Sequence, residues 1–398
     1  MKILFITARF PYPPVKGDKI IPYQRLKYFS QKHEITLLSL ADTQIAPAHL
    51  AAIREYCKEV LVVPLRKIES LANILVGGLS STPLQILYFR SRRFRMKLED
   101  LLRQNKYDLV HTFMLRMAPY VSGYKGCPRI IELIDAMELN MKRRASLEKN
   151  LKKWIFNEES RRLARYEKAM VKKFDHAIIV SEVDSKQIGA DNIVVSPLGV
   201  DDETFYPIRT IAKDPNLIIF SGNMGYFPNQ MAVLYFVQSI FPLIRKRKQD
   251  AEFWIVGGRA SDTIKDLEKS NKAIRVLGFV DSMAEYINRA SVSVSPMIAG
   301  SGMQFKILEA LACGVPVVAT SLAKGDIRLN EDDGLFVSDD ATSFAETVVG
   351  IMEEKGLQDF VEEKAPQAIK ENYSWERSNR MVENIYSKLQ IERMCINA

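Results

Sequence analysis

Short apolar segments alternate with amphipathic segments along almost the whole chain, and this alternation limits the fold more than any other feature. The apolar segments have the length of buried strands, and the segments between them repeat their apolar positions with a helical period. Strands are predicted at residues 2–7, 35–39, 60–63, 109–112, 129–134, 176–180, 193–195, 217–221, 252–256, 274–277, 292–295 and 316–320. Helices are predicted at residues 19–31, 48–57, 92–104, 230–246, 262–269, 282–288, 303–313, 341–353, 357–369 and 375–389. Strands that alternate with helices form parallel sheets, so the sequence predicts an α/β fold.

The chain is too long for one ordinary hydrophobic core, and the strand pattern restarts after a segment rich in turn residues at 197–207. We therefore predict two Rossmann-like domains, at residues 1–200 and 201–374, followed by a terminal helical segment at 375–398. The helical stretch at 136–173 is so long that it must bend or break. Two doubly wound domains that face each other across a cleft are the simplest arrangement, because ligands bind at the carboxyl ends of parallel strands.

The composition, 47% apolar and 26% charged, is that of a soluble globular protein. The first residues begin a strand and leave no room for a cleavable signal, and the longest apolar run, at 71–89, is interrupted by glycines, polar residues and Pro83. The four cysteines are scattered and form no metal-binding pattern. These features predict a cytoplasmic protein without a disulfide framework or a zinc site.

The positive charge is concentrated in the first half of the chain. Residues 1–200 hold 34 Lys and Arg against 20 Asp and Glu, whereas the remainder holds 22 against 28. Such an imbalance indicates an anionic partner, which could be a membrane surface, a phosphorylated acceptor or a nucleic acid. The segment 141–173 contains 12 basic against 4 acidic residues with interleaved aromatic residues, and residues 90–95 form a second basic cluster. A solvated helix explains the charges alone, and a helix that contacts anionic lipid explains the aromatic residues as well.

The block at 296–320 is the strongest candidate for a ligand site. It predicts a strand end, a loop with Gly300 and Gly302, a helix and a second buried strand. The glycines allow a ligand close to the backbone, and the start of the helix offers unpaired N–H groups and a positive dipole end. Lys306 and Glu309 lie three residues apart and share one helical face. This pattern suits a diphosphate followed by a ribose.

Further segments support the same interpretation through their order and spacing. They are Phe10-Pro-Tyr-Pro-Pro-Val-Lys-Gly-Asp-Lys-Ile20, Asp108-Leu-Val-His-Thr112, Phe174-Asp-His-Ala-Ile-Ile-Val-Ser-Glu-Val-Asp184, Gly199-Val-Asp201, Ser221-Gly-Asn-Met-Gly-Tyr-Phe-Pro-Asn229, Phe253-Trp-Ile-Val-Gly-Gly258, Leu277-Gly-Phe-Val280 and Tyr373-Ser-Trp-Glu376. With the block at 296–320, these segments resemble the family-4 glycosyltransferases, and most closely the bacterial branch linked to exopolysaccharide and cell-surface sugar assembly.

The resemblance implies the GT-B fold, with two Rossmann-like domains and a nucleotide-sugar in the cleft between them. It also implies that the last helix returns to the first domain. The expected activity is that of a hexosyltransferase, which moves a sugar from a nucleoside-diphosphate sugar to an acceptor hydroxyl with retention of configuration. The family works without a metal, so we expect no cofactor. The expected partners are the nucleotide-sugar, a sugar, lipid-linked or small-molecule acceptor and an anionic membrane surface, but no nucleic acid.

The donor site is expected mainly in the second domain. Glu309 matches the second glutamate of the family's E-x7-E motif and should hold the ribose, whereas Ser301 replaces the first. Backbone N–H groups of Ser301, Gly302 and Met303 could contact the sugar or phosphate instead. Lys306 is expected to stabilise the leaving diphosphate.

Four further positions complete the expected donor and acceptor contacts, each with an alternative explanation. Asn223 stands in a segment where many relatives carry phosphate-binding basic residues. Arg259 could supply the missing cation or be a surface residue. Phe279 should pack along the nucleobase, or it belongs to the core. Gly17 should allow close approach to the diphosphate, or it is a turn residue.

Two positions on the edge of the first domain complete the candidate site. His111 closes the strand at 109–112 and is expected to point toward the donor sugar and orient it, although a lone strand histidine is more often structural. Asp135 should hold the acceptor, or it caps the following helix.

Other classes of function remain open from sequence alone. A basic nucleic-acid-binding protein would need a recognition module, and none is visible. A nucleotide-sugar epimerase would need a pair of acid and base carboxylates, and the sequence singles out none. A family member without catalytic activity would explain Ser301. The acidic pairs at 201–202, 332–333 and 339–340 lie in predicted turns without the spacing of metal ligands.

Overall fold

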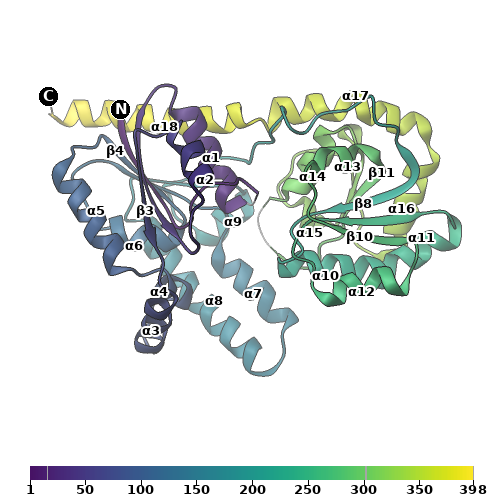
Figure 1. The fold of residues 1–398 in the computed structure, drawn as a ribbon, viewed down its shortest axis with the longest axis horizontal. Coiled ribbons are helices and arrows are strands. Elements are labelled where there is room, and N and C mark those ends of the chain that lie inside the picture. The colour runs from purple at the N-terminus through teal and green to yellow at the C-terminus, as the bar shows by residue number, and fades with distance from the viewer. Residues whose placement is uncertain (16, 301–302, 398) are drawn as a thin grey trace. The chain divides into compact units, whose positions relative to one another are not determined.

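The computed structural model describes residues 1–15, 17–300 and 303–397, and it divides into two parallel α/β units (Figure 1). Unit 1 comprises Met1–Pro197 together with Ser378–Ala398, and unit 2 comprises Leu198–Arg377. The division falls inside the turn-rich segment identified in the sequence and near the start of the last helix.

Unit 1 contains a seven-stranded parallel sheet with the order β3-β2-β1-β4-β5-β6-β7. Its strands are β1 (Lys2–Thr7), β2 (Glu34–Ala41), β3 (Glu59–Pro64), β4 (Leu109–Phe113), β5 (Arg129–Glu132), β6 (His176–Ile179) and β7 (Ile193–Val195). Its helices are α1 (Gly17–Phe29), α2 (Pro47–Arg54), α3 (Lys67–Gly77), α4 (Leu84–Tyr88), α5 (Arg92–Gln104), η1 (Leu115–Met117), α6 (Ala118–Val121), α7 (Met137–Leu147), α8 (Asn150–Val171) and α9 (Glu182–Ile188). The strand order reverses between β1 and β4, which is where such folds bind ligands.

Unit 2 repeats the same winding in a six-stranded parallel sheet, with the order β10-β9-β8-β11-β12-β13. Its strands are β8 (Asp214–Ser221), β9 (Glu252–Val256), β10 (Ile274–Gly278), β11 (Ala290–Ser295), β12 (Val317–Ala319) and β13 (Leu335–Val337). Its helices are α10 (Phe227–Tyr235), η2 (Phe236–Ile240), α11 (Phe241–Arg247), α12 (Asp262–Ser270), α13 (Met283–Arg289), α14 (Phe305–Ala312), α15 (Ser321–Lys324), η3 (Glu331–Asp333), α16 (Ala341–Glu353) and α17 (Lys355–Asn372). The helix α18 (Trp375–Asn397) begins in unit 2 and continues into unit 1.

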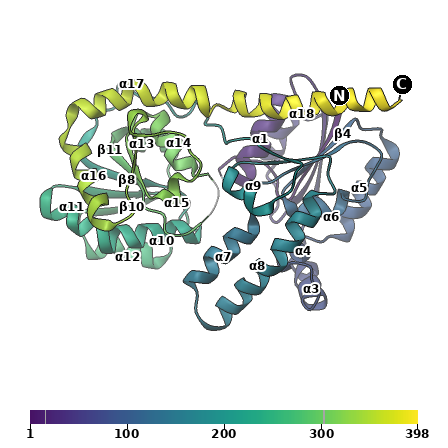
Figure 2. The same cartoon turned by 180° about the vertical axis from the view of Figure 1, so that it is seen from behind.

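The predicted fold class, two doubly wound parallel sheets, is confirmed. The long helical stretch predicted at 136–173 breaks between α7 and α8, and Figure 2 shows the two helices side by side as a hairpin. The prediction missed α3 and α4, which overlap the apolar run at 71–89, the helices α6, α9 and α15, and the short edge strand β13. All of these elements except α3 are short, and α3 overlaps an apolar run that is interrupted by glycines, polar residues and Pro83.

Buried carboxylates of α8 cap other helices of unit 1. Glu167 accepts hydrogen bonds from the backbone N–H groups of Met137 (2.7 Å) and Glu138 (3.2 Å) at the start of α7. Glu159 accepts from Leu84 (2.9 Å) and Gln85 (3.0 Å) at the start of α4. The first turn of a helix has no internal partners for these N–H groups. Glu159 and Glu167 of this basic helix therefore stabilise the starts of α4 and α7.

A buried polar network joins α18 to the sheet of unit 1. Arg25 of α1 contacts Glu132 of β5 with Nη2 at 2.8 Å and Nε at 3.1 Å, and its Nη1 donates to Asn379 of α18 at 2.7 Å. His111 of β4 lies with Nε2 3.0 Å from Glu132 and Nδ1 2.5 Å from the hydroxyl of Tyr386. The paired side chains of Arg25 and Glu132 are at most 2% exposed. The network therefore neutralises a charge that would otherwise be costly to bury.

The network also controls the ionisation of Glu132. Burial by itself raises the pKa of this carboxyl, but the charge and hydrogen bonds of Arg25 together with His111 outweigh burial and lower it from 4.5 to about 2. Since the folded-state pKa is depressed, the stabilisation is complete above pH 4.5 and is lost as the pH falls toward 2.

We predict that Glu132→Gln destabilises unit 1 by about 3–5 kcal/mol, because it leaves Arg25 buried without a counter-charge. Urea unfolding followed by circular dichroism measures the change. Glu34→Gln is the control, because Glu34 forms an exposed pair with Lys58 and its loss should matter little. Between pH 4.5 and 2 the unfolding free energy of the variant should fall less steeply than that of the wild type. Equal losses in the two variants would contradict the assigned role of the network.

Candidate functional site

The sheet of unit 2 changes its winding direction between β8 and β11, and the loops that follow these strands carry most of the expected donor residues. Ser221 and Ser295 end the two strands, and their buried hydroxyls have no hydrogen-bond partner in the described part of the chain. α14 begins after the second loop, at Phe305 instead of the predicted Met303. The site therefore combines loop backbone, unpaired hydroxyls and a helix start.

Lys306 extends from the first turn of α14 into the interior of unit 2 and is only 7% exposed. Its Nζ donates a hydrogen bond to Asn229 Oδ1 at 2.6 Å and lies 4.2 Å from the centre of the Phe220 ring. Burial lowers the pKa of Lys306 to about 7, against a smaller opposing effect of Glu309. An ammonium has three donors. A buried lysine with one strong acceptor can bind an additional anion.

Asn229 connects this lysine to the loop after β8. Its Nδ2 donates to the carbonyl of Asn223 at 2.9 Å, while its Oδ1 accepts from Lys306. Gly222 and Gly257 pack backbone against backbone, since a Cβ at Gly257 would lie within van der Waals overlap of the Gly222 carbonyl. Gly257 also has a φ of 141°. Only glycine fits at this contact, so the loops after β8 and β9 are locked together.

Glu309 lies one turn further along α14 and is half-buried. Burial raises the pKa of its carboxyl to about 7, although the charge of Lys306 acts in the opposite direction. No hydrogen bond or ion pair engages this carboxylate within residues 1–15, 17–300 and 303–397. A carboxylate with free acceptors beside a cation suits a ligand that carries hydroxyls next to phosphates.

Arg259 follows β9 and lies beside the loop after β8. A Cβ at Gly225 would lie 3.2 Å from Arg259 Cβ, and the Arg259 backbone has a φ of 67°, which is uncommon for a residue other than glycine. The side chain is exposed and has no hydrogen bond within the described residues. Asn223 accepts a hydrogen bond from the Gly225 N–H at 2.9 Å and so shapes this loop. The guanidinium is thus available near the position where the sequence lacks phosphate-binding residues.

The other expected donor residues have distinct environments. Phe279 follows Gly278 at the end of β10 and is 74% exposed, so the alternative of a core aromatic residue is wrong. Met303 lies half-buried in the segment before α14. Ser301 and Gly302 lie outside the described residues. Gly17 is the first residue of α1 in unit 1.

His111 does not have the position expected from the sequence. It lies inside β4, is fully buried and directs both ring nitrogens toward Glu132 and Tyr386 of its own unit. Its ring stacks on Phe5 with 4.4 Å between ring centres. Burial lowers the pKa of His111 in spite of Glu132, so the ring is neutral at pH 7. The structure gives His111 a structural role, because the side chain has no exposed surface through which it could touch a sugar.

Asp135 lies half-buried after β5, where Asn140 Nδ2 donates to its carboxylate at 2.7 Å. The residue before the first turn of α7 is Ala136, so the proposed capping role of Asp135 is wrong. Its use as an acceptor ligand stays a prediction.

Two arginines that the sequence analysis did not single out lie at the same edge of the sheet in unit 1. Arg9 follows β1 and forms an ion pair with Asp18 of α1. Arg116 of η1 follows β4, and burial and the nearby charge of Arg9 lower its pKa to about 10, while Asp135 and Asp18 oppose this. The sequence could have indicated them, because each follows one of two adjacent parallel strands at the reversal of the sheet.

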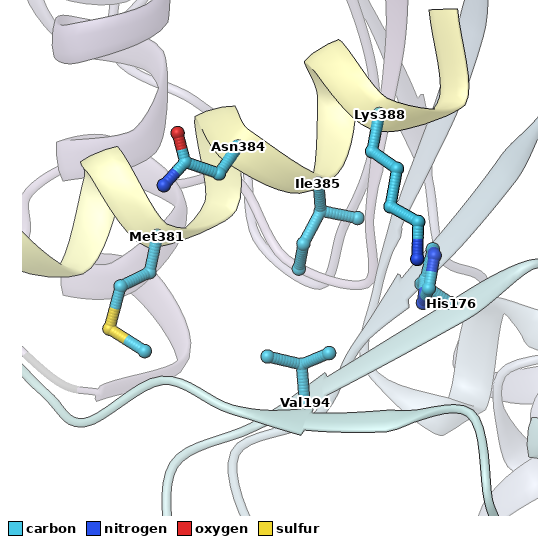
Figure 3. A pocket seen from close by; sticks show the side chains of 6 residues that line it. All are labelled: His176, Val194, Met381, Asn384, Ile385 and Lys388. Carbon is cyan, nitrogen blue, oxygen red and sulfur yellow. The ribbon is translucent and has the colours of Figure 1, made fainter. Parts of the chain in front are cut away.

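A shallow pocket of about 300 Å³ lies elsewhere in unit 1, between α18 and the strands β6 and β7 (Figure 3). Its lining is His176, Val194, Met381, Asn384, Ile385 and Lys388. His176 is the first residue of β6, so the pocket lies toward the amino end of that strand. Ligands of parallel sheets bind at the opposite edge. We therefore do not place the functional site in this pocket.

Comparisons with known proteins relate unit 2 to one family. The profile described as "Glycosyl transferases group 1" matches residues 215–371, which form most of unit 2. An uncharacterized 44.6 kDa protein in the cps region of Klebsiella pneumoniae is 22% identical, over 94% of this chain and 96% of its own length. A UDP-Gal:alpha-D-GlcNAc-diphosphoundecaprenol alpha-1,3-galactosyltransferase of Escherichia coli is 23% identical, over 80% of this chain and 85% of its own length.

The fold has a close counterpart among solved structures. The sucrose-phosphate synthase of Thermosynechococcus elongatus superposes with a TM-score of 0.73 at 15% identity, over 98% of this chain and 99% of that one. Residues 215–371 thus match the group 1 glycosyltransferases, and the chain has the GT-B fold. No helix in the described ranges is long and apolar enough to cross a membrane. Within the same ranges, no group of three or more His, Cys, Asp or Glu residues could hold a metal ion.

We predict that Lys306→Met weakens the binding of a nucleoside diphosphate by about 10- to 100-fold, the loss expected for a hydrogen bond to a charged group. Isothermal titration calorimetry measures the affinity. The melting temperature of the unliganded variant should stay the same or rise, because Met removes a desolvated cation. Lys272→Met is the control, since Lys272 is exposed and lies before β10. Unchanged affinity in the Lys306 variant would show that this lysine does not bind the diphosphate.

Proposed function

We propose that this glycosyltransferase moves a hexosyl group from a uridine-diphosphate sugar to an acceptor hydroxyl, with retention of configuration, in the synthesis of a bacterial surface polysaccharide. The observation that carries the proposal is the pair of Lys306 and Glu309 on the first turns of α14, at the reversal of the sheet in a unit that matches the group 1 glycosyltransferases. The roles proposed for the other residues follow from the charge and hydrogen-bonding capacity of their side chains.

The departing diphosphate needs positive charge that is already in place. Lys306 and the N–H groups at the start of α14 supply it from inside unit 2, and Arg259 adds an exposed cation from the loop after β9. Glu309 accepts hydrogen bonds from the ribose hydroxyls. The exposed ring of Phe279 offers a surface for the nucleobase. Backbone N–H groups at 301–303 remain candidates for contacts with the sugar.

The acceptor belongs to unit 1 in this proposal. Its edge after β1, β4 and β5 carries Arg9, Arg116 and Asp135, a mixture of cations and a carboxylate that can hold phosphate and hydroxyl groups. The named activity of the Escherichia coli relative supports a lipid-linked diphosphate acceptor and a uridine-diphosphate donor. The capsule-region relative of Klebsiella pneumoniae supports a surface polysaccharide as the product.

The leaving phosphate itself is proposed to take the proton of the acceptor hydroxyl on the face from which it departs, so that no protein base is required. Neither His111, which is buried, nor a metal ion has a part in this scheme. Because the scheme uses no metal ion, transfer should continue in the presence of a chelator. We also propose that the enzyme acts at the cytoplasmic side of the membrane.

We predict that nucleoside diphosphates raise the melting temperature and that uridine diphosphate has the largest effect. A thermal-shift panel of the diphosphates and their hexose derivatives measures this directly. Glu309→Ala should abolish discrimination between ribose and deoxyribose diphosphates, because its carboxylate contacts the hydroxyls. Glu285→Ala serves as the control on a neighbouring helix. If no nucleotide shifts the melting temperature, the proposed function is wrong.

The affinity for a nucleotide-sugar should pass through a maximum near pH 7. Burial lowers the pKa of Lys306 to about 7, so its charge disappears above this pH, and burial raises the pKa of Glu309 to about 7, so its charge disappears below it. Uridine-diphosphate glucose is the suitable probe, because its esterified diphosphate does not titrate in this range. Calorimetry across pH should show the acidic decline vanish in Glu309→Gln and the alkaline decline vanish in Lys306→Met. A flat profile in the wild type would refute the assignment.

A further inference from the structure

α3 presents its apolar side chains to solvent and its polar side chains to the protein. Ile68, Leu71, Leu75, Val76 and, just after the helix, Leu79 are between 57% and 101% exposed. Their spacing places them along one helical face. An amphipathic helix in a soluble protein normally has the opposite orientation, so this face needs a partner.

The polar side of α3 is fixed to unit 1. Ser70 is buried, Glu69 accepts a hydrogen bond from the backbone N–H of Arg92 at 2.9 Å, and Asn73 donates to the carbonyl of Arg90 at 2.9 Å. At the other end of α3, Arg162 of α8 donates to the carbonyl of Gly78 at 2.8 Å. These bonds set which face is turned outward. The exposure of the apolar residues is therefore a property of the fold and not of a loosely attached helix.

The surroundings of α3 are strongly basic. Residues 66–95 contain six Lys and Arg but a single acidic residue, Glu69, whose carboxylate is occupied by the Arg92 N–H. The exposed members are Arg66, Lys67, Arg90, Arg92, Arg93 and Arg95. The bonds of Glu69 and Asn73 place the start of α5 directly beside α3. An apolar helical face bordered by cations matches an anionic lipid surface, whose acyl region and head groups it can contact together.

α8 carries a second, smaller feature of the same kind. Leu151, Trp154 and Ile155 are exposed on one face near the start of α8, and Lys152 and Lys153 lie between them. Figures 1 and 2 show that α3 and the α7–α8 hairpin extend from the sheet of unit 1 in the same direction. Tryptophan favours the interface between lipid and water. Two separate elements thus offer apolar and basic groups on one side of this unit.

We propose that α3 is a membrane-docking helix, which inserts its outward apolar face into the interfacial region of an anionic bilayer while the basic residues at 66–95 contact the lipid head groups. The tip of α8, with Trp154, forms an auxiliary contact. The inference concerns lipid binding alone and does not depend on the proposed transfer reaction.

The test is flotation of the full-length protein with vesicles of phosphatidylcholine, with and without phosphatidylglycerol. We expect binding to the anionic vesicles that declines as salt is added, and little binding to the neutral ones. The triple variant Ile68→Ser, Leu75→Ser and Val76→Ser should bind at least about tenfold more weakly, because it removes apolar side chains that would enter the lipid. Phe360→Ser with Ile391→Ser is the matched control, since both side chains are exposed on other helices.

Trp154 provides an independent readout. Lipids brominated in the acyl chain should quench its fluorescence in the wild type but much less in the α3 variant. The nucleotide-induced thermal shift, measured on the same samples, shows that the variants remain folded and separates a failure of docking from a failure of the transferase proposal. The proposal is overturned if the α3 variant binds vesicles as the wild type does, or if the wild type does not bind. It is also overturned if the apolar face instead holds two copies together, seen as a wild-type dimer that the variant loses in analytical ultracentrifugation.

Discussion

A buried cation organises each unit, and the way in which its charge is compensated separates structure from function. In unit 1, Arg25 has a carboxylate partner in Glu132 and an amide partner in Asn379. In unit 2, Lys306 has the neutral Asn229 and the face of Phe220. A charge that is fully paired holds elements together, whereas a charge that lacks an anion favours a ligand that supplies one. For this reason we propose that the diphosphate binds beside Lys306.

The same reasoning explains the different outcomes for the two residues expected to be catalytic. Lys306 was singled out from its place at a helix start after a glycine-rich loop, and the fold turns it toward the loops at the reversal of the sheet. His111 was singled out from a motif at a strand end. Its strand continues to Phe113, and its side chain joins the network with Glu132 and Tyr386. The partner Tyr386 lies 275 residues away, so no local pattern could have revealed the network.

Membrane contact shows a similar contrast. The basic and aromatic composition of 141–173 indicates a lipid surface, but two of its four acidic residues, Glu159 and Glu167, are occupied with capping α4 and α7. The clearer candidate is α3, a helix that the sequence analysis did not predict. Its apolar residues resemble a core-facing stripe, and only the attachment of Glu69, Ser70 and Asn73 to the protein shows that the stripe faces outward.

The sequence by itself determined the α/β class, most strands and most residues of α14, because period, turn residues and helix-start signals are local properties of the chain. It also indicated Phe279 and Arg259 as candidates, each with an alternative. Tertiary structure decided that Phe279 lies outside the core, that His111 is structural, that Arg9 and Arg116 lie at one edge, and which way α3 faces. These outcomes depend on burial and on contacts between distant segments, and burial is set only when the sheets are formed and the helices are packed against them.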